Sequence, residues 1–392
     1  MGGIESNPAR TLSHSFPASM EAFEDPAERI GSARSQSVAE FGMREGVRLG
    51  ERPLGEVKVS PANAKQNEGV SHLRKPNSPI KSLFKYCAFA VTAFVPKLVS
   101  LALSRPMREA VFGGQADRKG GGGALERFQS RINAMPNARM VELPDRDGEV
   151  LRGHFFSPAS SDSPGQPDLN KPVVLLLTGS GGSAQEQGYD LAKMYSEKHG
   201  VNVLCMNYRG FGDSDGGLPS RNQVYKDGHT MFNHLLDQGF KSGDVMIHGY
   251  SLGATVAAKL QQSAEKQGVP LKGVFYDRPM TSVRAAAKAH MGGGAAGWVA
   301  GVLGRWGVGR MSAKAKLDAL PDDSKTPMLF SHDEGALGSN AKNLGDKMQA
   351  RFADKCKGVI ATNLEHLDNQ GTAELYAGHS ALGDMLRPKD GV

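Results

Sequence analysis

The stretch from Asp244 to Thr255 constrains the fold of this chain more than any other part of the sequence. It reads as a short apolar strand, a turn of the form Gly-x-Ser-x-Gly, and an alanine-rich helix. The serine of the turn, Ser251, must adopt a strained backbone conformation if its hydroxyl is to project above the edge of a sheet. Gly249 and Gly253, two positions before and after it, relieve the crowding of such a turn. The pattern therefore predicts a nucleophilic serine on a sharp strand-to-helix turn.

After about residue 139, segments typical of strands alternate with segments typical of helices. A hairpin is expected over 139–156, because two alternating segments flank a turn that contains Asp-Gly. One helix is expected after residue 183 and up to about His199, and another is expected over 221–237. A continuous apolar segment, as in a strand covered on both faces of a parallel sheet, occupies 173–177, and further strands are expected at 201–207, 271–276, 327–331 and 358–364. This alternation indicates an α/β fold with a mostly parallel, doubly wound sheet.

Composition divides the 392 residues into three parts. Residues 1–78 are rich in Ser, Pro, Gly, Glu and Arg and poor in aromatic residues, so we expect a disordered N-terminal region there. Residues 79–124 combine an apolar helical segment with basic flanks and a glycine-rich linker. Residues 125–392 are expected to form the α/β domain.

The apolar run, 83–103, is compatible with three interpretations. It is a helix packed on the α/β domain, a segment that lies on a membrane surface, or a helix that spans the membrane. A spanning helix needs about 20 apolar residues with few charges. Pro96 and Lys97 lie inside the run, and the charge disfavours spanning. The basic flanks would favour an anionic leaflet in the second interpretation.

The N-terminus carries two signals about where the protein acts. The first six residues fit the pattern for N-myristoylation of Gly2, although a pattern this short also occurs by chance. They do not show the charged-then-apolar pattern of a Sec signal peptide. Together with the Ser-rich N-terminal region and the basic composition, these features favour a secreted bacterial effector that associates with membranes of a host cell and contributes to virulence. A cytoplasmic or inner-membrane-associated protein is the alternative.

Charge and cysteine content argue against several classes of protein. The formal net charge is +6, but no basic helix face or aromatic RNA motif accompanies it, so nucleic acid is not an expected partner. Cys87, Cys205 and Cys356 lie far apart, which favours a reducing compartment over a disulfide scaffold. No His-Glu-x-x-His or Cys-x-x-Cys pattern is present, and we expect neither a metal nor an organic cofactor. The oligomeric state does not follow from these features.

A nucleophilic serine of this kind needs an acid and a histidine downstream, in that order. Asp333 follows a late strand and is the expected acid, with Glu334 and Asp277 in reserve. Two histidines, His366 and His379, follow the last predicted strand. We prefer His379, because it lies in a loop, where catalytic groups commonly occur, whereas His366 lies almost on the strand end.

The expected mechanism is attack of Ser251 on an acyl carbonyl, with His379 as general base and Asp333 orienting the imidazole. Two backbone N–H groups must stabilise the resulting oxyanion. One is expected from Leu252, the residue after the nucleophile. The other is expected from Ser180, in the glycine-rich loop after the first parallel strand. That loop also fits a loose dinucleotide-binding pattern, but the next strand does not end in the acidic residue that such a site requires.

Several blocks resemble the α/β-hydrolase superfamily: Thr178-Gly179-Ser180, Asn207-Tyr208-Arg209-Gly210-x-Gly212-x-Ser214, Gly249-Tyr250-Ser251-Leu252-Gly253 and Pro279-x-Thr281-Ser282. They are similar to the Bem46/ABHD-type serine hydrolases. The Asn-Tyr-Arg-Gly, Gly-Tyr-Ser-Leu-Gly and Asp277-Arg278 blocks look especially like the chlamydial CHLPS-type hydrolase-like proteins. The resemblance covers about 139–386 and implies an ester, thioester or amide hydrolase, with Asp333 and His379 at the acid and histidine positions. The sequence departs from the family pattern at one position: Thr178 precedes Gly179 where these hydrolases often have a histidine before the glycine.

The resemblance also implies an inserted lid, here at 284–318, which contains both tryptophans of the chain. The lid is an apolar cap that receives an acyl chain or touches a membrane, or else a set of ordinary packed helices. The leading hypothesis is a serine hydrolase of the esterase, lipase or thioesterase type, with a small-molecule or lipid-like acyl substrate. The alternative is a catalytically silent protein of the same fold that acts by binding at a membrane.

Overall fold

The structure of the protein, a computed structural model, describes residues 124–145, 148–290, 311–366 and 368–387, with isolated residues between 105 and 112 and between 294 and 308. Three predicted segments lie wholly or largely outside the described residues: the N-terminal region 1–78 with Gly2, the apolar segment 83–103 and the predicted lid. Within the described part of the chain, no helix is both long and apolar enough to span a membrane.

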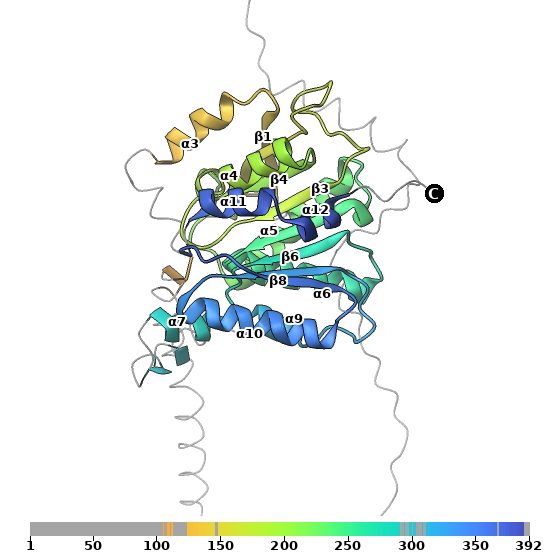
Figure 1. Ribbon diagram of the computed structural model, residues 1–392. Coiled ribbons are helices and arrows are strands. Elements are labelled where there is room, and N and C mark those ends of the chain that lie inside the picture. The colour runs from red at the N-terminus through yellow and green to blue at the C-terminus, as the bar shows by residue number, and fades with distance from the viewer. Residues whose placement is uncertain are drawn as a thin grey trace, which may run out of the picture. The chain divides into compact units, whose positions relative to one another are not determined.

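A mixed sheet forms the centre of the described domain (Figure 1). Its strands follow the spatial order β1-β2-β4-β3-β5-β6-β7-β8. They are β1 (Ala138–Pro144), β2 (Val150–Phe156), β3 (Val173–Leu177), β4 (Asn202–Met206), β5 (Val245–Tyr250), β6 (Gly273–Asp277), β7 (Met328–His332) and β8 (Cys356–Ala361). β2 pairs antiparallel with β1 and with β4, and the remaining pairs are parallel. The predicted hairpin and the mostly parallel sheet are confirmed.

Helices cover both faces of this sheet. They are α3 (Ala124–Asn133), α4 (Ala184–Lys193) with a π-helical turn Met194–Lys198, α5 (Arg221–Asp237), α6 (Leu252–Gln267), α7 (Val283–His290), α9 (Ala313–Leu317), α10 (Gly335–Arg351), α11 (Asn369–Ala377) and α12 (Ser380–Leu386). In Figure 1, α4, α11 and α12 lie on one side of the sheet, and α6, α9 and α10 lie on the other. The sheet is therefore doubly wound, as predicted.

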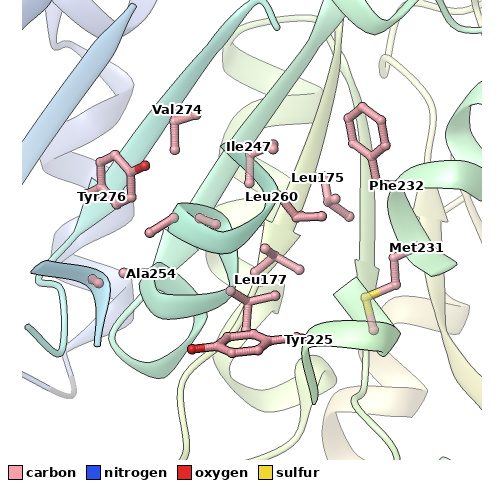
Figure 2. Close-up of a cluster of buried hydrophobic side chains, with 14 of the residues drawn as sticks. Leu175, Leu177, Tyr225, Met231, Phe232, Ile247, Ala254, Leu260, Val274 and Tyr276 are labelled. Atoms are coloured by element: carbon pink, nitrogen blue, oxygen red, sulfur yellow. The ribbon is translucent and has the colours of Figure 1, made fainter. Parts of the chain in front are cut away.

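The continuous apolar run of β3 follows from this double covering. Leu175 and Leu177 belong to the buried cluster on the side of α5, α6, α9 and α10 (Figure 2). Val174 and Leu176 point the other way and belong to the cluster that includes residues of α4, α11 and α12. Successive strand residues face opposite sides of a sheet, so a strand buried on both faces has to be apolar at every position.

Arg209 ties the β1–β2 hairpin to the rest of the domain. Its side chain is 2% exposed and lies 2.6 Å from Asp145 and 2.7 Å from Asp227 of α5. Its Nε also donates to Asp227 at 2.9 Å. A buried guanidinium requires such paired carboxylates, because an unpaired charge in the interior is costly. Arg209 therefore has a structural role in the loop after β4.

The parallel strands place four of the candidate functional residues at one edge of the sheet. Ser180 follows β3, Ser251 follows β5, Asp333 follows β7 and His366 follows β8. Because parallel strands present their carboxyl ends at the same edge, residues far apart in the sequence come together there.

Candidate active site

Ser251 occupies a strained turn between β5 and α6. Its φ of 51° and ψ of −108° lie in a region that non-glycine residues rarely adopt. Two backbone hydrogen bonds hold this conformation: the Ser251 N–H donates to the Asp277 carbonyl at 3.0 Å, and the Met280 N–H donates to the Ser251 carbonyl at 3.1 Å. The predicted strained serine at a strand-to-helix turn is confirmed.

The glycines on either side are required by close backbone contacts. A Cβ atom on Gly249 would lie 2.7 Å from the Cα of Ala254. A Cβ atom on Gly253 would lie 2.0 Å from the carbonyl oxygen of Leu177, the last residue of β3. The first turn of α6 therefore packs directly on the end of β3, and only glycine fits between them.

His366 connects Ser251 with Asp333. The Nε2 atom of His366 lies 3.0 Å from the Ser251 Oγ, and its Nδ1 atom makes a short hydrogen bond with the Asp333 Oδ2. The Asp333 side chain is 3% exposed, and that of His366 is 26% exposed. A buried carboxylate, an imidazole and a serine hydroxyl thus form a continuous hydrogen-bonded chain. This is the arrangement in which an imidazole accepts a proton from a serine hydroxyl.

His379, the histidine preferred from the sequence, is not in this chain of hydrogen bonds. It is the N-cap residue of α12, and its N–H donates to the Tyr376 carbonyl at 3.1 Å. Its Nδ1 atom is buried without a hydrogen-bond partner among the described residues. The preference for His379 over His366 is therefore corrected: the structure brings His366 to Ser251.

The reason for this correction is the end of the last strand. β8 ends at Ala361 rather than at 364, and Asn363 has a φ of 52° that turns the chain. His366 consequently lies in a loop, where it faces the turn of Ser251, and not on the strand end. The predicted strand 358–364 ends three residues after β8, which is why the prediction places His366 almost on a strand end.

The reserve acids have other surroundings. Glu334 is an exposed residue at the N-cap position of α10. Asp277 is buried, and its carboxylate makes hydrogen bonds with the side chains of His248 and Arg278. Asp333, and neither of these two residues, pairs with His366. No group of three or more His, Cys, Asp or Glu side chains that could hold a metal ion occurs in the described ranges.

The expected oxyanion donors lie at the same edge of the sheet. Leu252 is the first residue of α6, where backbone N–H groups have no acceptor within the helix. A Cβ atom on Gly253 would lie 2.8 Å from the Thr178 carbonyl oxygen, so the loop that contains Ser180 begins beside this helix N-terminus. In that loop, the Gly179 N–H donates to the Gln187 side chain at 2.8 Å. The roles of Leu252 and Ser180 as donors stay predictions.

A buried ionic pair, Asp277 and Arg278, lies next to Ser251 and the loop of His366. Their side chains are fully buried and in contact at 2.9 Å. Burial by itself would raise the pKa of Asp277, but the Arg278 guanidinium and His248 overcome that effect and hold this pKa well below its usual range. Arg278 also donates to the backbone carbonyl of His366 at 2.9 Å. The sequence shows Asp277 and Arg278 as neighbours, but it gives no sign of this contact with the loop of His366.

Several known proteins are similar to this chain in sequence. Residues 170–353 match a family model described as serine aminopeptidase, S33. A multifunctional-autoprocessing repeats-in-toxin of Vibrio vulnificus is 33% identical over 252 residues, which are 64% of this chain and 5% of the toxin. A lysophosphatidylserine lipase, ABHD12, of Rattus norvegicus is 33% identical over 124 residues, which are 31% of this chain and 30% of the lipase. The chain therefore spans only a small part of these relatives.

Solved structures show the same fold. The crystal structure of an alpha-beta hydrolase from Vibrio vulnificus superposes with a TM-score of 0.59 at 26% identity, over 81% of this chain and 98% of that one. The thermostable carboxylesterase EstE1, cloned from a metagenomic library, superposes with a TM-score of 0.50 at 15% identity, over 75% of this chain and 98% of that one. At such an identity, the second likeness concerns the fold alone.

Proposed function

This chain is a member of the α/β-hydrolase superfamily, of the ABHD-like type, and we propose that it is a serine hydrolase that cleaves an acyl ester or thioester. One observation carries the proposal: the imidazole of His366 lies 3.0 Å from a strained serine hydroxyl and bonds a buried carboxylate with its other nitrogen. A protein that acted only by binding would gain nothing from a strained serine of this kind.

In this mechanism the Ser251 Oγ attacks the carbonyl carbon of the substrate while His366 Nε2 accepts the hydroxyl proton. The charge that develops on the carbonyl oxygen is stabilised by the N–H groups of Leu252 and Ser180. His366 then gives the proton to the departing alcohol or thiol, which leaves an acyl group on Ser251. Water attacks this acyl-enzyme with His366 again as base, the bond between the acyl group and the Ser251 Oγ breaks, and His366 returns the proton to Ser251 as the carboxylic acid leaves. Asp333 holds the Nδ1–H of the imidazole throughout.

The proposed substrate carries an apolar acyl chain. Similarity to a lysophosphatidylserine lipase supports a lipid-like ester. The described part of the lid offers apolar surface as well, since Trp298 is 58% exposed and Val299 is 46% exposed. Water-exposed aromatic and aliphatic side chains at a lid are suited to contact an acyl chain or a lipid surface.

The proposal predicts labelling by a fluorophosphonate probe, which reacts with activated serines. The full chain should be labelled, and Ser251→Ala should abolish the labelling. His366→Ala should do the same, because the base is lost. His379→Ala is the matched control and should be labelled at the rate of the unchanged protein. An unlabelled protein, or a label that persists in Ser251→Ala, refutes the proposed nucleophile.

The substrate class is tested separately. A series of p-nitrophenyl esters of increasing chain length and a lysophospholipid should be hydrolysed, with kcat/KM rising from acetate to a longer acyl chain. Amino-acid p-nitroanilides provide the comparison, because the matching family model is named after an aminopeptidase. Faster cleavage of the anilides than of every ester would make the protein a peptidase instead.

We also propose that the protein acts as an effector at a membrane of a host cell. The composition of the N-terminal region and the similarity to part of a Vibrio toxin support this. A translocation reporter fused to residues 1–60 should reach the host cell. Liposome flotation of the full chain should exceed that of a protein without 1–110. A reporter retained in the bacterium, or equal flotation, argues against the respective half of this proposal.

A further inference from the structure

Arg278 has an unusual position for a charged residue. It follows β6 directly, is 1% exposed, and has a φ of 43°, a conformation that favours glycine. Its guanidinium forms a fork with the carboxylate of Asp277, with Nε at 2.9 Å from Oδ1 and Nη2 at 3.3 Å from Oδ2. A buried charge on a strained backbone is costly, so the surrounding structure must determine both the backbone and the side chain.

The rest of the guanidinium bonds the loop that carries His366. Nη1 donates to the carbonyl oxygens of Glu365 at 3.3 Å and His366 at 2.9 Å. Nη2 donates to the Asn369 side chain, in the first turn of α11, at 3.3 Å. The Tyr250 hydroxyl donates to the same His366 carbonyl. Two donors therefore hold the backbone of the proposed base.

The same dipeptide holds the nucleophile. The Asp277 carbonyl accepts the Ser251 N–H at 3.0 Å, while the Asp277 side chain anchors Arg278, which binds the loop of His366. We infer that Arg278 is a positioning residue, which fixes the imidazole of His366 relative to the hydroxyl of Ser251. The inference rests on the proposed function, because it assigns Arg278 to the reaction of that triad.

The contacts require arginine rather than any cation. The planar guanidinium has five N–H donors in a fixed geometry, so it can bond a carboxylate and a loop at the same time. A lysine ammonium would keep a positive charge beside Asp277, but as a point charge it cannot satisfy both sets of acceptors. The Asp277 Oδ1 also accepts from Tyr376 at 2.7 Å and Ser331 at 2.8 Å, so the carboxylate retains other partners. Arg278→Lys should thus preserve the fold and loosen the loop.

Tyr250→Phe is an independent second variant. The ring of Tyr250 lies against the Arg278 guanidinium, whose central carbon is 4.6 Å from the ring centroid. Removal of the hydroxyl leaves this stacking in place and deletes one of the two donors to the His366 carbonyl. Arg278 keeps every one of its own hydrogen bonds in this variant. The two substitutions therefore weaken the same loop without sharing a risk to the fold.

The experiment measures two quantities with the full chain and a fluorophosphonate probe: the final fraction of labelled protein and the second-order rate constant of labelling. The fraction counts correctly folded sites, and the rate constant reports how well each site is arranged. For Arg278→Lys we expect complete final labelling with a rate constant about 10- to 100-fold lower, because a misplacement of a reacting group by about 1 Å can cost about 100-fold in rate. For Tyr250→Phe we expect a smaller loss of about 10-fold, because Arg278 still donates to the His366 carbonyl.

Arg209→Lys is the matched control. Arg209 is similarly buried in the loop after β4, and its Nε and Nη2 both bind the Asp227 carboxylate. This substitution should lower the temperature of unfolding and leave the rate constant unchanged. A rate constant for Arg278→Lys equal to that of the unchanged protein, or a loss confined to the labelled fraction, overturns the inference. If Arg278→Lys does not fold, an unchanged rate constant in Tyr250→Phe overturns it. Absence of labelling in the unchanged protein refutes instead the proposed function itself.

Discussion

Gly253 lies where α6 begins against the end of β3, and its replacement by alanine should force the two elements apart. The added Cβ atom would lie 2.0 Å from the Leu177 carbonyl oxygen and 2.8 Å from the Thr178 carbonyl oxygen. Both atoms belong to the backbone, at the end of β3 and at the start of the loop after it, so neither can move aside as a flexible side chain would. Restoring an ordinary contact of 3.4 Å requires a displacement of about 1.4 Å in an interior that is already close-packed.

The displacement should affect rate and stability together. The first turn of α6 carries Leu252 and follows Ser251 directly, so the nucleophile and a proposed oxyanion donor would move relative to His366. A misplacement of about 1 Å can cost about 100-fold in rate, and overpacking typically costs about 1–3 kcal/mol of stability. We therefore expect labelling of Gly253→Ala by a fluorophosphonate to be about 100-fold slower.

A glycine outside the site provides the control. Gly383 lies within α12, and a Cβ atom added there would meet nothing within 4 Å. Gly383→Ala should label at the normal rate and gain about 0.5–1 kcal/mol from the better helix propensity of alanine. Stopped labelling reactions and urea unfolding of both variants give the two quantities. Normal labelling and normal stability in Gly253→Ala would refute the close packing from which the magnitude was derived.

Three further predictions concern stability. Burial lowers the pKa of His154 from 6.5 to about 4. Below pH 6.5 the unfolded chain binds a proton at this histidine while the folded protein does not, so the free energy of unfolding is highest above pH 6.5 and falls as the pH falls toward 4. Urea unfolding should show a loss of about 3 kcal/mol over that interval, and a His154→Gln variant with the same slope would contradict this. Ser220 caps α5, and Ser220→Ala should cost about 1 kcal/mol without changing the rate of labelling; a slower rate would contradict a purely structural role. Arg209→Met leaves Asp227 without its buried partner and should cost about 3–5 kcal/mol by urea unfolding, and a loss below 1 kcal/mol would count against this pairing.

Much of the fold could be predicted from local patterns. The continuous apolar run at 173–177 coincides with β3, and the predicted helix 221–237 coincides with α5. Both are long or distinctive patterns with clear ends. The end of β8 could not be predicted, because no glycine or proline marks it in the sequence, whereas in the structure Asn363 already turns the chain. α11 was not predicted, since its sequence has no strong apolar periodicity.

The candidate site divides in the same way. Ser251 could be identified from its neighbours, because the steric demands of the turn are satisfied by glycines only two residues away. Asp333 could be identified because it directly follows a recognisable strand. The choice between two histidines depended on where a loop folds back, and the sequence criterion selected the wrong one. The role proposed for Arg278 has no local signature, since the loop it bonds lies 88 residues further along the chain.

The amino-acid sequence by itself determined the strained serine, the glycines that permit it, the acid after β7 and the alternation of strands and helices. These features depend on contacts within a few residues, which spacing and residue type report directly. Only the tertiary structure decided that His366, 115 residues from Ser251, is the histidine beside it, and that Asp277 and Arg278 hold both. The physical reason is that these contacts form across the carboxyl edge of a parallel sheet. There, the path of each loop depends on the packing of the whole domain.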